Sequence, residues 1–186
     1  MIVATNNQGK VEEIKSILES DNIYSLKDKG INIDVVEDGN TFLENAQKKA
    51  KEIYNITKEE VIADDSGLCI DCLDGFPGVK THRFLDNVSN EEKNEYIIQE
   101  VNKHDNRDAS FICVIVHYDG EQFINCEGVL KGTIALERRG HNGFGFDEIF
   151  ELTNGLTLAQ LSSEEQNKIS ARYIALNKLK ERLHEI

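Results

Sequence analysis

The first eighteen residues most strongly constrain the fold, because a short apolar run is followed at once by an amphipathic pattern. Ile2-Val3-Ala4 is typical of a short buried strand. Apolar side chains then recur at the spacing of one helix face, at Val11, Ile14, Ile17 and Leu18. A strand, a turn and a helix in this order indicate an α/β protein.

Further strands and helices are predicted in the first half of the chain. Residues 31–36 alternate in the manner of a strand, and residues 42–54 carry an apolar helical stripe. Residues 61–63 form a short apolar run that ends in two carboxylates. Gly67 is expected to turn the chain before it continues extended.

The second half is predicted to hold two helices around a hairpin. A capping box opens a polar helix at Ser89. Asp119-Gly120 separates two extended runs and is a strong hairpin signal. This hairpin, over residues 108–130, could belong to a second lobe. Another capping signal at Ser162 opens one terminal helix with an apolar stripe.

Size and charge restrict the class of protein. The chain has 186 residues and a net charge of −13. This length suits a single domain over residues 1–186, built as one body or as two tightly joined lobes. The acidic balance argues against DNA and RNA, whose phosphates are bound by basic patches. Without a long apolar run or a basic leader segment, the sequence predicts a cytoplasmic protein with no membrane partner.

The four cysteines allow two interpretations. Cys69 and Cys72 form a C-x-x-C pair, which would suit a redox pair or half of a zinc site. However, positions three apart in a strand point to opposite faces, and Cys113 and Cys126 lack metal-ligand spacing. The pattern therefore favours reduced thiols with no catalytic role.

A polar turn links the first strand to the first helix. Thr5, Asn7 and Lys10 lie there, where backbone N–H groups at a helix N-terminus favour anions. A phosphate could bind at this turn, with Lys10 adding a point charge. The alternative is an ordinary N-capping turn, since Asn and Thr are common caps.

Acidic residues at two places could bind a hard cation. Asp64 and Asp65 are adjacent, and side chains of neighbouring strand residues point apart, so one of them is expected to face a given cleft. Magnesium is typically bound by one or two carboxylates together with phosphates and water. Glu37 offers a second ligand by the same logic. A turn or capping role is the alternative for both segments.

A glycine-rich segment combines two aromatic rings with a carboxylate. Phe144 and Phe146 alternate with glycines that permit close backbone approach, and Asp147 follows. Aromatic rings can stack on a planar base, although core packing is the alternative for at least one of them.

Taken together and in this order, these segments resemble the inosine triphosphate pyrophosphatase family, and the match runs nearly end to end. Five separated motifs carry the resemblance, and a sixth stretch closes it. They are Ala4-Thr5-x-Asn7-x-x-Lys10, Thr41-Phe42-x-Glu44-Asn45-Ala46-x-x-Lys49-Ala50, Ala63-Asp64-Asp65-Ser66-Gly67-Leu68, Gly75-x-Pro77-Gly78-Val79, Gly143-Phe144-Gly145-Phe146-Asp147-x-Ile149-Phe150, and Ala159-x-Leu161 to Ile169-Ser170-x-Arg172.

The resemblance implies a fold and a reaction. The fold is α/β, with an elongated mixed central sheet, helices on both faces and two lobes flanking an active-site cleft, commonly in a homodimer. The reaction is magnesium-dependent hydrolysis of ITP, dITP or XTP to the nucleoside monophosphate and pyrophosphate.

Residue roles follow from the same resemblance. Asp65 would bind Mg²⁺ and accept the proton of the attacking water. Arg172 would reach the keto oxygen that separates hypoxanthine and xanthine from adenine. The other substrate contacts implied are Thr5, Asn7, Lys10, Lys49, Ser66, Phe144, Gly145, Phe146, Asp147 and Gln166.

Two positions depart from the family pattern. Ala171 replaces the histidine of a Ser-His-Arg run, and Gln166 replaces a lysine, with Lys168 two residues further along the helix. Base and phosphate contacts are therefore expected to be weakened or altered. The alternative function is a nucleotide-binding sensor that has reduced or lost turnover.

Overall fold

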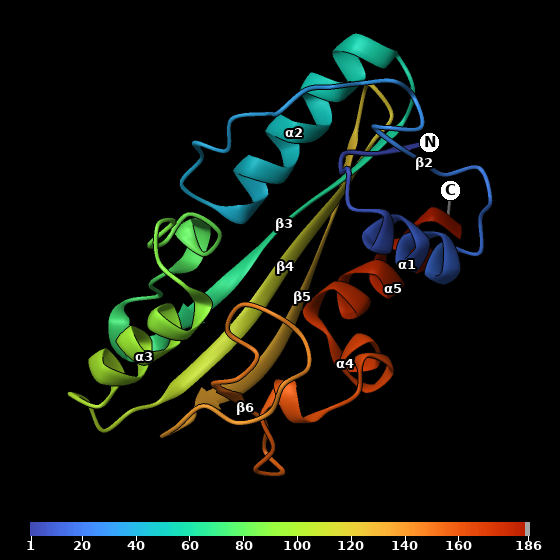
Figure 1. The fold of residues 1–186 in the computed structure, drawn as a ribbon. Helices are drawn as coiled ribbons and strands as arrows, with labels where there is room; N and C mark the ends of the chain where they lie inside the picture. Colours follow the sequence, from blue (N-terminus) through green and yellow to red (C-terminus); the bar gives the residue numbers. More distant parts are fainter. Residues whose placement is uncertain (185–186) are drawn as a thin grey trace. The chain divides into compact units, whose positions relative to one another are not determined.

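The computed structural model describes residues 1–184, which form five α-helices and one six-stranded sheet. Figure 1 shows the elements in chain order. They are β1 (Ile2–Val3), α1 (Gln8–Leu18), β2 (Tyr24–Ser25), α2 (Phe42–Thr57), β3 (Val61–Ile70), α3 (Asn90–Val101), β4 (Asp108–Tyr118), β5 (Phe123–Ile134), β6 (Phe150–Glu151), α4 (Ser163–Ile169) and α5 (Ala171–His184), with 3-10 turns at Asp71–Leu73, Gly78–Lys80 and Leu158–Gln160.

The sheet is mixed, in the order β2-β1-β3-β4-β5-β6. β1 pairs in parallel with both β2 and β3, whereas β5 and β6 are antiparallel. The predicted tight turn joins β4 to β5, where the Asp119 N–H donates to Gln122 O at 3.4 Å. The predicted α/β class with a mixed sheet is therefore confirmed.

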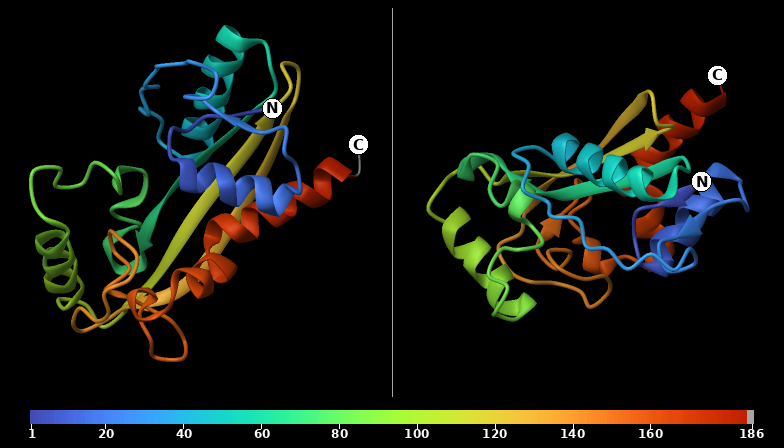
Figure 2. Two further views of the ribbon diagram at one scale, coloured as in Figure 1. Left: turned by 45° about the vertical axis from the view of Figure 1, so that its right-hand side comes forward. Right: turned by 90° about the horizontal axis from the view of Figure 1, so that it is seen from above.

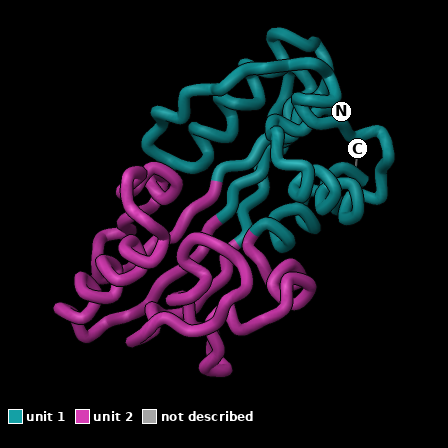
Figure 3. Tube along the Cα trace, in the orientation of Figure 1, with its two compact units in different colours: residues 1–65, 113–128, 172–186 teal, residues 66–112, 129–171 magenta. Residues whose placement is uncertain are grey.

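The chain divides into two compact units (Figure 3). Unit 1 comprises residues 1–65, 113–128 and the segment from Arg172 onward, and unit 2 comprises residues 66–112 and 129–171. The middle hairpin is divided, because residues 113–128 belong to unit 1 and its two ends belong to unit 2.

In unit 1, helices lie on both faces of the strands. α2 lies on one face, and α1 and α5 lie side by side on the other (Figures 1 and 2), where Lys180 of α5 pairs with Glu19 at 2.7 Å. Asn7 caps α1, because its side chain accepts from the N–H groups of Gly9 and Lys10. Thr41 caps α2 in the same manner through the Glu44 N–H.

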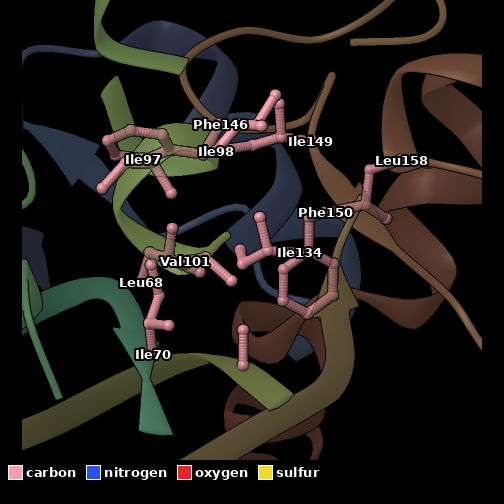
Figure 4. Close-up of a cluster of buried hydrophobic side chains, with 11 residues drawn as sticks. Leu68, Ile70, Ile97, Ile98, Val101, Ile134, Phe146, Ile149, Phe150 and Leu158 are labelled. Atoms are coloured by element: carbon pink, nitrogen blue, oxygen red, sulfur yellow. The ribbon is translucent and has the colours of Figure 1, made fainter. Parts of the chain in front are cut away.

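The core of unit 2 is apolar (Figure 4). α3 begins at the predicted capping box, in which Ser89 and Glu92 satisfy each other's backbone N–H groups. Its buried face then packs with residues of β3, β5 and the segment before β6. The cluster consists of Leu68, Ile70, Ile97, Ile98, Val101, Ala109, Ile134, Phe146, Ile149, Phe150 and Leu158.

Three predicted features are wrong. Residues 31–36 form no strand, and Ile33 and Val36 remain 37% and 64% exposed, so the alternating apolar side chains gain no burial. Gly67 makes no turn, because β3 continues from Val61 to Ile70 with Gly67 buried inside it. The acidic pair therefore lies within a strand and not at its end.

The third error concerns the C-terminal helix, which is two helices. α4 ends at Ile169, its C-cap Ser170 has an extended backbone (φ −61°, ψ 151°), and α5 begins at Ala171. The Ser170 hydroxyl donates to Asn167 O at 3.4 Å, a local bond of the kind by which serine competes with helical hydrogen bonding. Arg172 is consequently placed in the first turn of a new helix.

Among the helices of residues 1–184, none combines the length and apolar character needed to cross a bilayer.

Candidate active site

Asp64 is the centre of a buried charge cluster in unit 1. Its side chain is 5% exposed, and its Oδ2 accepts from Lys10 Nζ at 3.1 Å. Arg172 donates to the same oxygen from Nε at 3.4 Å and from Nη2 at 3.3 Å. Helices α1 and α5 thus each bring one cation to the middle of β3.

The surroundings of Asp64 keep it ionised. Burial alone would raise the pKa of this carboxyl, but Lys10, Arg172 and Lys49 outweigh burial and hold the pKa well below its usual range. The same attraction raises the pKa of Arg172 against the opposing effect of burial. Asp64 and Arg172 are therefore both charged at neutral pH.

Asp65 points to the other face of β3, as expected for neighbouring residues of a strand. Its Oδ2 accepts from Asn45 Nδ2 of α2 at 2.8 Å. The Asn45 oxygen in turn accepts from the Gly39 N–H at 2.8 Å. Asn45 and Asp65 are 1% and 5% exposed, so a buried amide fixes the orientation of this carboxylate.

Lys49 joins the two acidic segments predicted from the sequence. Its Nζ donates to the backbone oxygen of Asp64 at 2.7 Å and forms an ion pair with Glu37. Burial lowers the pKa of Lys49, but Asp64 and Glu37 together raise it above its usual value. Glu37, Lys49 and Asp65 thus lie around one stretch of β3 and α2.

The polar turn before α1 is an N-capping turn and also presents Lys10. Thr5 Oγ1 accepts from the Asn7 N–H at 3.1 Å, and Asn7 Oδ1 accepts from Gly9 and Lys10. Capping uses the amide oxygen of Asn7, and an asparagine amide also carries two donor hydrogens. Capping therefore does not conflict with the predicted contacts to a phosphate.

Glu13 is a further member of the Asp64 cluster. Its Oε2 lies 3.6 Å from Nη1 of Arg172, and its Oε1 is buried with no hydrogen-bond partner. Burial raises the pKa of Glu13, and the nearby Arg172 opposes that rise. Arg172 is consequently held between Asp64 and Glu13.

The glycine-rich segment in unit 2 separates its two rings. Phe146 is 5% exposed and belongs to the core, whereas Phe144 is 79% exposed. Asp147 Oδ2 accepts from the Phe144 N–H at 3.0 Å. Burial raises the pKa of Asp147 to about 6, although this hydrogen bond acts in the opposite direction.

The remaining predicted contacts in unit 2 are placed as follows. Ser66 follows Asp65 on β3 and is half-buried. Gln166 Nε2 donates to Leu158 O at 2.7 Å and so links α4 to the preceding 3-10 turn. Lys168 pairs with Glu164 at 2.6 Å on an exposed helix face, and Ala171, which replaces the family histidine, is buried.

The cysteines and acidic residues form no closed metal site within residues 1–184. In this part of the chain, no group of three or more His, Cys, Asp or Glu side chains could hold a metal ion, and no disulfide is formed. Cys113 is buried in unit 1. Burial is the main cause that raises the pKa of its thiol to about 12, and the negative charge of Asp64 adds to that rise. That thiol is unreactive at neutral pH.

Fold and site together define an α/β protein that surrounds buried carboxylates with lysine and arginine. The sequence model of the Ham1 family matches residues 1–182. The dITP/XTP pyrophosphatases of Clostridium tetani and Clostridium perfringens are 41% and 46% identical, over 98% of this chain and 95% and 96% of theirs.

Solved structures agree with the sequence comparison. The Staphylococcus aureus Ham1 protein superposes with a TM-score of 0.93 at 35% identity, covering 99% of this chain and 97% of that one. A HAM1 protein from Coxiella burnetii gives 0.92 at 34% identity, covering 100% and 98%. The chain therefore belongs to the Ham1 family, and it is an enzyme of the pyrophosphatase class. The resemblance inferred from the motifs is confirmed.

Sequence reasoning gave no role to three residues that contact the candidate site residues. They are Glu13 beside Arg172, Asn45 beside Asp65, and Asn94, a fully buried residue of α3 that contacts the glycine-rich segment. Only Asn45 had an available signal, because it lies beside the apolar stripe of the helix predicted over residues 42–54 and buried polar groups need partners.

Proposed function

We propose that this enzyme hydrolyses the noncanonical purine nucleoside triphosphates ITP, dITP and XTP between the α and β phosphates, giving the nucleoside monophosphate and pyrophosphate with Mg²⁺. The observation that carries the proposal is the arrangement on β3. Asp64 is neutralised by Lys10 and Arg172, while the adjacent Asp65 is held by the neutral amide of Asn45.

Phosphate binding is assigned to the turn before α1 and to the lysines. The α1 N-terminus presents backbone N–H groups with a partial positive charge, and Lys10 extends from its first turn. Lys49 adds a second cation on the opposite side of β3. Such fixed donors stabilise the charge that develops in phosphoryl transfer.

Asp65 and Glu37 fit a magnesium ion that is completed by substrate. Mg²⁺ usually takes one or two carboxylates, with phosphate oxygens and water completing its shell, so three clustered acidic residues are not required. When bound, the ion supplies charge neutralisation and polarises the phosphate oxygens. Glu37 is paired with Lys49, and the proposal requires Glu37 to exchange that partner when it binds the metal.

Water activation is assigned to Asp65. A carboxylate accepts a proton from water only if it is held in the ionised form and correctly oriented, and the Asn45 amide supplies the orientation. General-base assistance of this kind is typically worth about 10² to 10⁴ in rate. Ser66 is assigned a contact to the substrate beside Asp65.

Base recognition is assigned to Phe144–Asp147 and to Arg172. The exposed ring of Phe144 suits stacking on a purine, and a guanidinium donates to a keto oxygen but not to an amino group. Arg172 donates to Asp64 from Nε and Nη2 in this structure, and a guanidinium carries five N–H donors, so others are left for a keto oxygen. Gln166 replaces the family lysine and would contribute a weaker contact.

The assembly and location follow from the family resemblance. We propose a cytoplasmic homodimer that binds no nucleic acid. Analytical ultracentrifugation at micromolar concentration tests the assembly, with a single species of twice the chain mass expected.

A screen of pyrophosphate release tests the proposed function. Purified enzyme is incubated with ITP, dITP, XTP, ATP and GTP, with and without Mg²⁺. Release from the first three that depends on Mg²⁺ and far exceeds release from ATP and GTP supports the proposal. Binding of ITP without release would favour the sensor, and equal release from all five would remove the assigned specificity.

A further inference from the structure

Asn94 is a buried polar residue on the apolar face of α3. Its side chain is 0% exposed, and the residues on the same helix face are Ile97, Ile98 and Val101. Asparagine is a poor helix former, and an apolar side chain would pack better at this position. The contacts of the amide therefore have to explain its presence in the core.

The amide of Asn94 is used at one end only. Nδ2 donates to Gly145 O at 3.1 Å and lies 3.5 Å from Glu148 Oε2, whereas Oδ1 is buried with no hydrogen-bond partner. Rotating the amide would place its oxygen against two acceptors, so only this orientation is compatible with the contacts. The hydrogen bond to Gly145 is therefore made while the Oδ1 atom of Asn94 stays without a hydrogen-bond partner.

Gly145 lies at a point where the backbone has little stiffness of its own. Gly143 and Gly145 flank Phe144 and have positive φ angles of 79° and 62°. Glycine at such angles gives the chain wide conformational freedom, so the path of this segment depends on external hydrogen bonds.

Two side chains supply those bonds, one on each side of Phe144. Asp147 Oδ2 accepts from the Phe144 N–H at 3.0 Å, and Asn94 donates to the carbonyl of Gly145. The carbonyl between them, that of Phe144, accepts from the backbone N–H of Asp147 at 3.3 Å. Phe146 is fixed in the core, whereas the Phe144 ring is 79% exposed and has no such packing. The direction of the ring is therefore set by its backbone.

We infer that Asn94 is a positioning residue for base recognition, which holds the Gly145 peptide so that the Phe144 ring is presented to a purine. The inference rests on the proposed function of the Phe144–Asp147 segment. Arg138 adds a second link from α3 to this segment, since it pairs with Glu95 at 3.1 Å and with Glu148 at 3.4 Å. These pairs are partly exposed and contribute less than a buried bond.

The test replaces Asn94 by leucine. This removes a satisfied donor and an unsatisfied acceptor together, so stability should change little while the Gly145 carbonyl loses its partner. KM for ITP and for XTP should rise about tenfold, the effect of losing one buried hydrogen bond, with kcat within about twofold of wild type. Hydrogen exchange of residues 143–147 should become faster.

Arg107→Met is the matched control, because Arg107 also donates to backbone carbonyls of unit 2, at Ile134 and Ala135. It should lower the melting temperature without raising KM. If leucine overfills the site and the variant does not fold, Asn94→Ala removes the amide without added volume.

The outcomes separate the two proposals. Wild-type KM and unchanged exchange in a folded Asn94 variant would overturn the positioning role while leaving the proposed function intact. Absence of pyrophosphate release from the wild-type enzyme would instead refute the proposed function. If KM rises as much for Arg107→Met as for Asn94→Leu, the rise comes from general destabilisation, and the inference is overturned.

Discussion

Arg172 donates to Oδ2 of Asp64 from both Nε and Nη2, although the two residues lie 108 positions apart in the chain. Lys10 reaches the same oxygen from α1. One carboxylate oxygen therefore connects the first helix, the third strand and the last helix of unit 1. The side chain of its neighbour Asp65 lies on the opposite face of the strand, where Asn45 is a hydrogen-bond partner.

Asp64→Asn should destabilise the protein by about 3 kcal/mol, because removing one member of a buried charge cluster leaves the others uncompensated. Urea unfolding followed by circular dichroism measures the loss. Glu12→Gln is the control, since Glu12 is 59% exposed and pairs with Lys15 at 3.5 Å. That substitution should cost less than about 0.5 kcal/mol. Equal losses would mean that the Asp64 cluster is not a structural centre.

Asp65→Asn should leave stability nearly unchanged and lower kcat about 10² to 10⁴-fold, because the amide keeps the shape but cannot accept a proton from water. Steady-state pyrophosphate release measures the effect. Asp38→Asn is a suitable control, because Asp38 is 67% exposed and pairs with Lys48 at 2.6 Å. Turnover of Asp65→Asn at the wild-type rate would exclude Asp65 as the base.

Asp147 should make stability depend on pH. Its folded-state pKa of about 6 lies above the ordinary value of 3.8. The protonated Asp147 side chain therefore contributes stability that is fully present below pH 3.8 and is lost as pH rises through 6. Asp147→Asn should therefore be more stable than wild type by up to about 2 kcal/mol at pH 7.5, with the difference shrinking toward pH 4. Urea unfolding at both pH values checks the sign, and a pH-independent difference would contradict the assignment.

Gly143→Ala should weaken nucleotide binding as well as stability. Gly143 has a φ of +79°, and an added Cβ would clash with Oδ2 of Asp147, which holds the Phe144 N–H. Gly155→Ala is the matched control, since Gly155 has a φ of +83° but open space around the added carbon. Both should lose about 1 kcal/mol through backbone strain. KM for ITP should rise for Gly143→Ala alone, and equal KM values would exclude the clash as a cause.

Local patterns predicted much of the fold. The strand and helix of the first eighteen residues, the α2 stripe, the capping box at Ser89 and the turn at Asp119-Gly120 all formed as expected. These features depend on neighbours within a few positions. Residues 31–36 show the limit of local patterns. Alternating apolar residues form a strand only where another strand pairs with them and a core buries their apolar side chains.

The motifs named candidate site residues but not the contacts between them. The motifs proposed Lys10, Lys49, Asp65 and Arg172 as candidates. Nothing in their spacing indicates that Arg172 contacts Asp64 or that Asn45 contacts Asp65. Such contacts arise when elements far apart in sequence pack together. The break at Ser170, which places Arg172 in the first turn of α5, was likewise hidden within a continuous helical pattern.

The most direct test of the account is identification of the products formed from ITP. The enzyme is incubated with ITP and Mg²⁺, and nucleotides and phosphates are resolved by phosphorus NMR. Equal amounts of IMP and pyrophosphate are predicted, with their formation by Asp65→Asn slowed about 10² to 10⁴-fold. Formation of IDP and orthophosphate would place cleavage at the wrong bond and contradict the account.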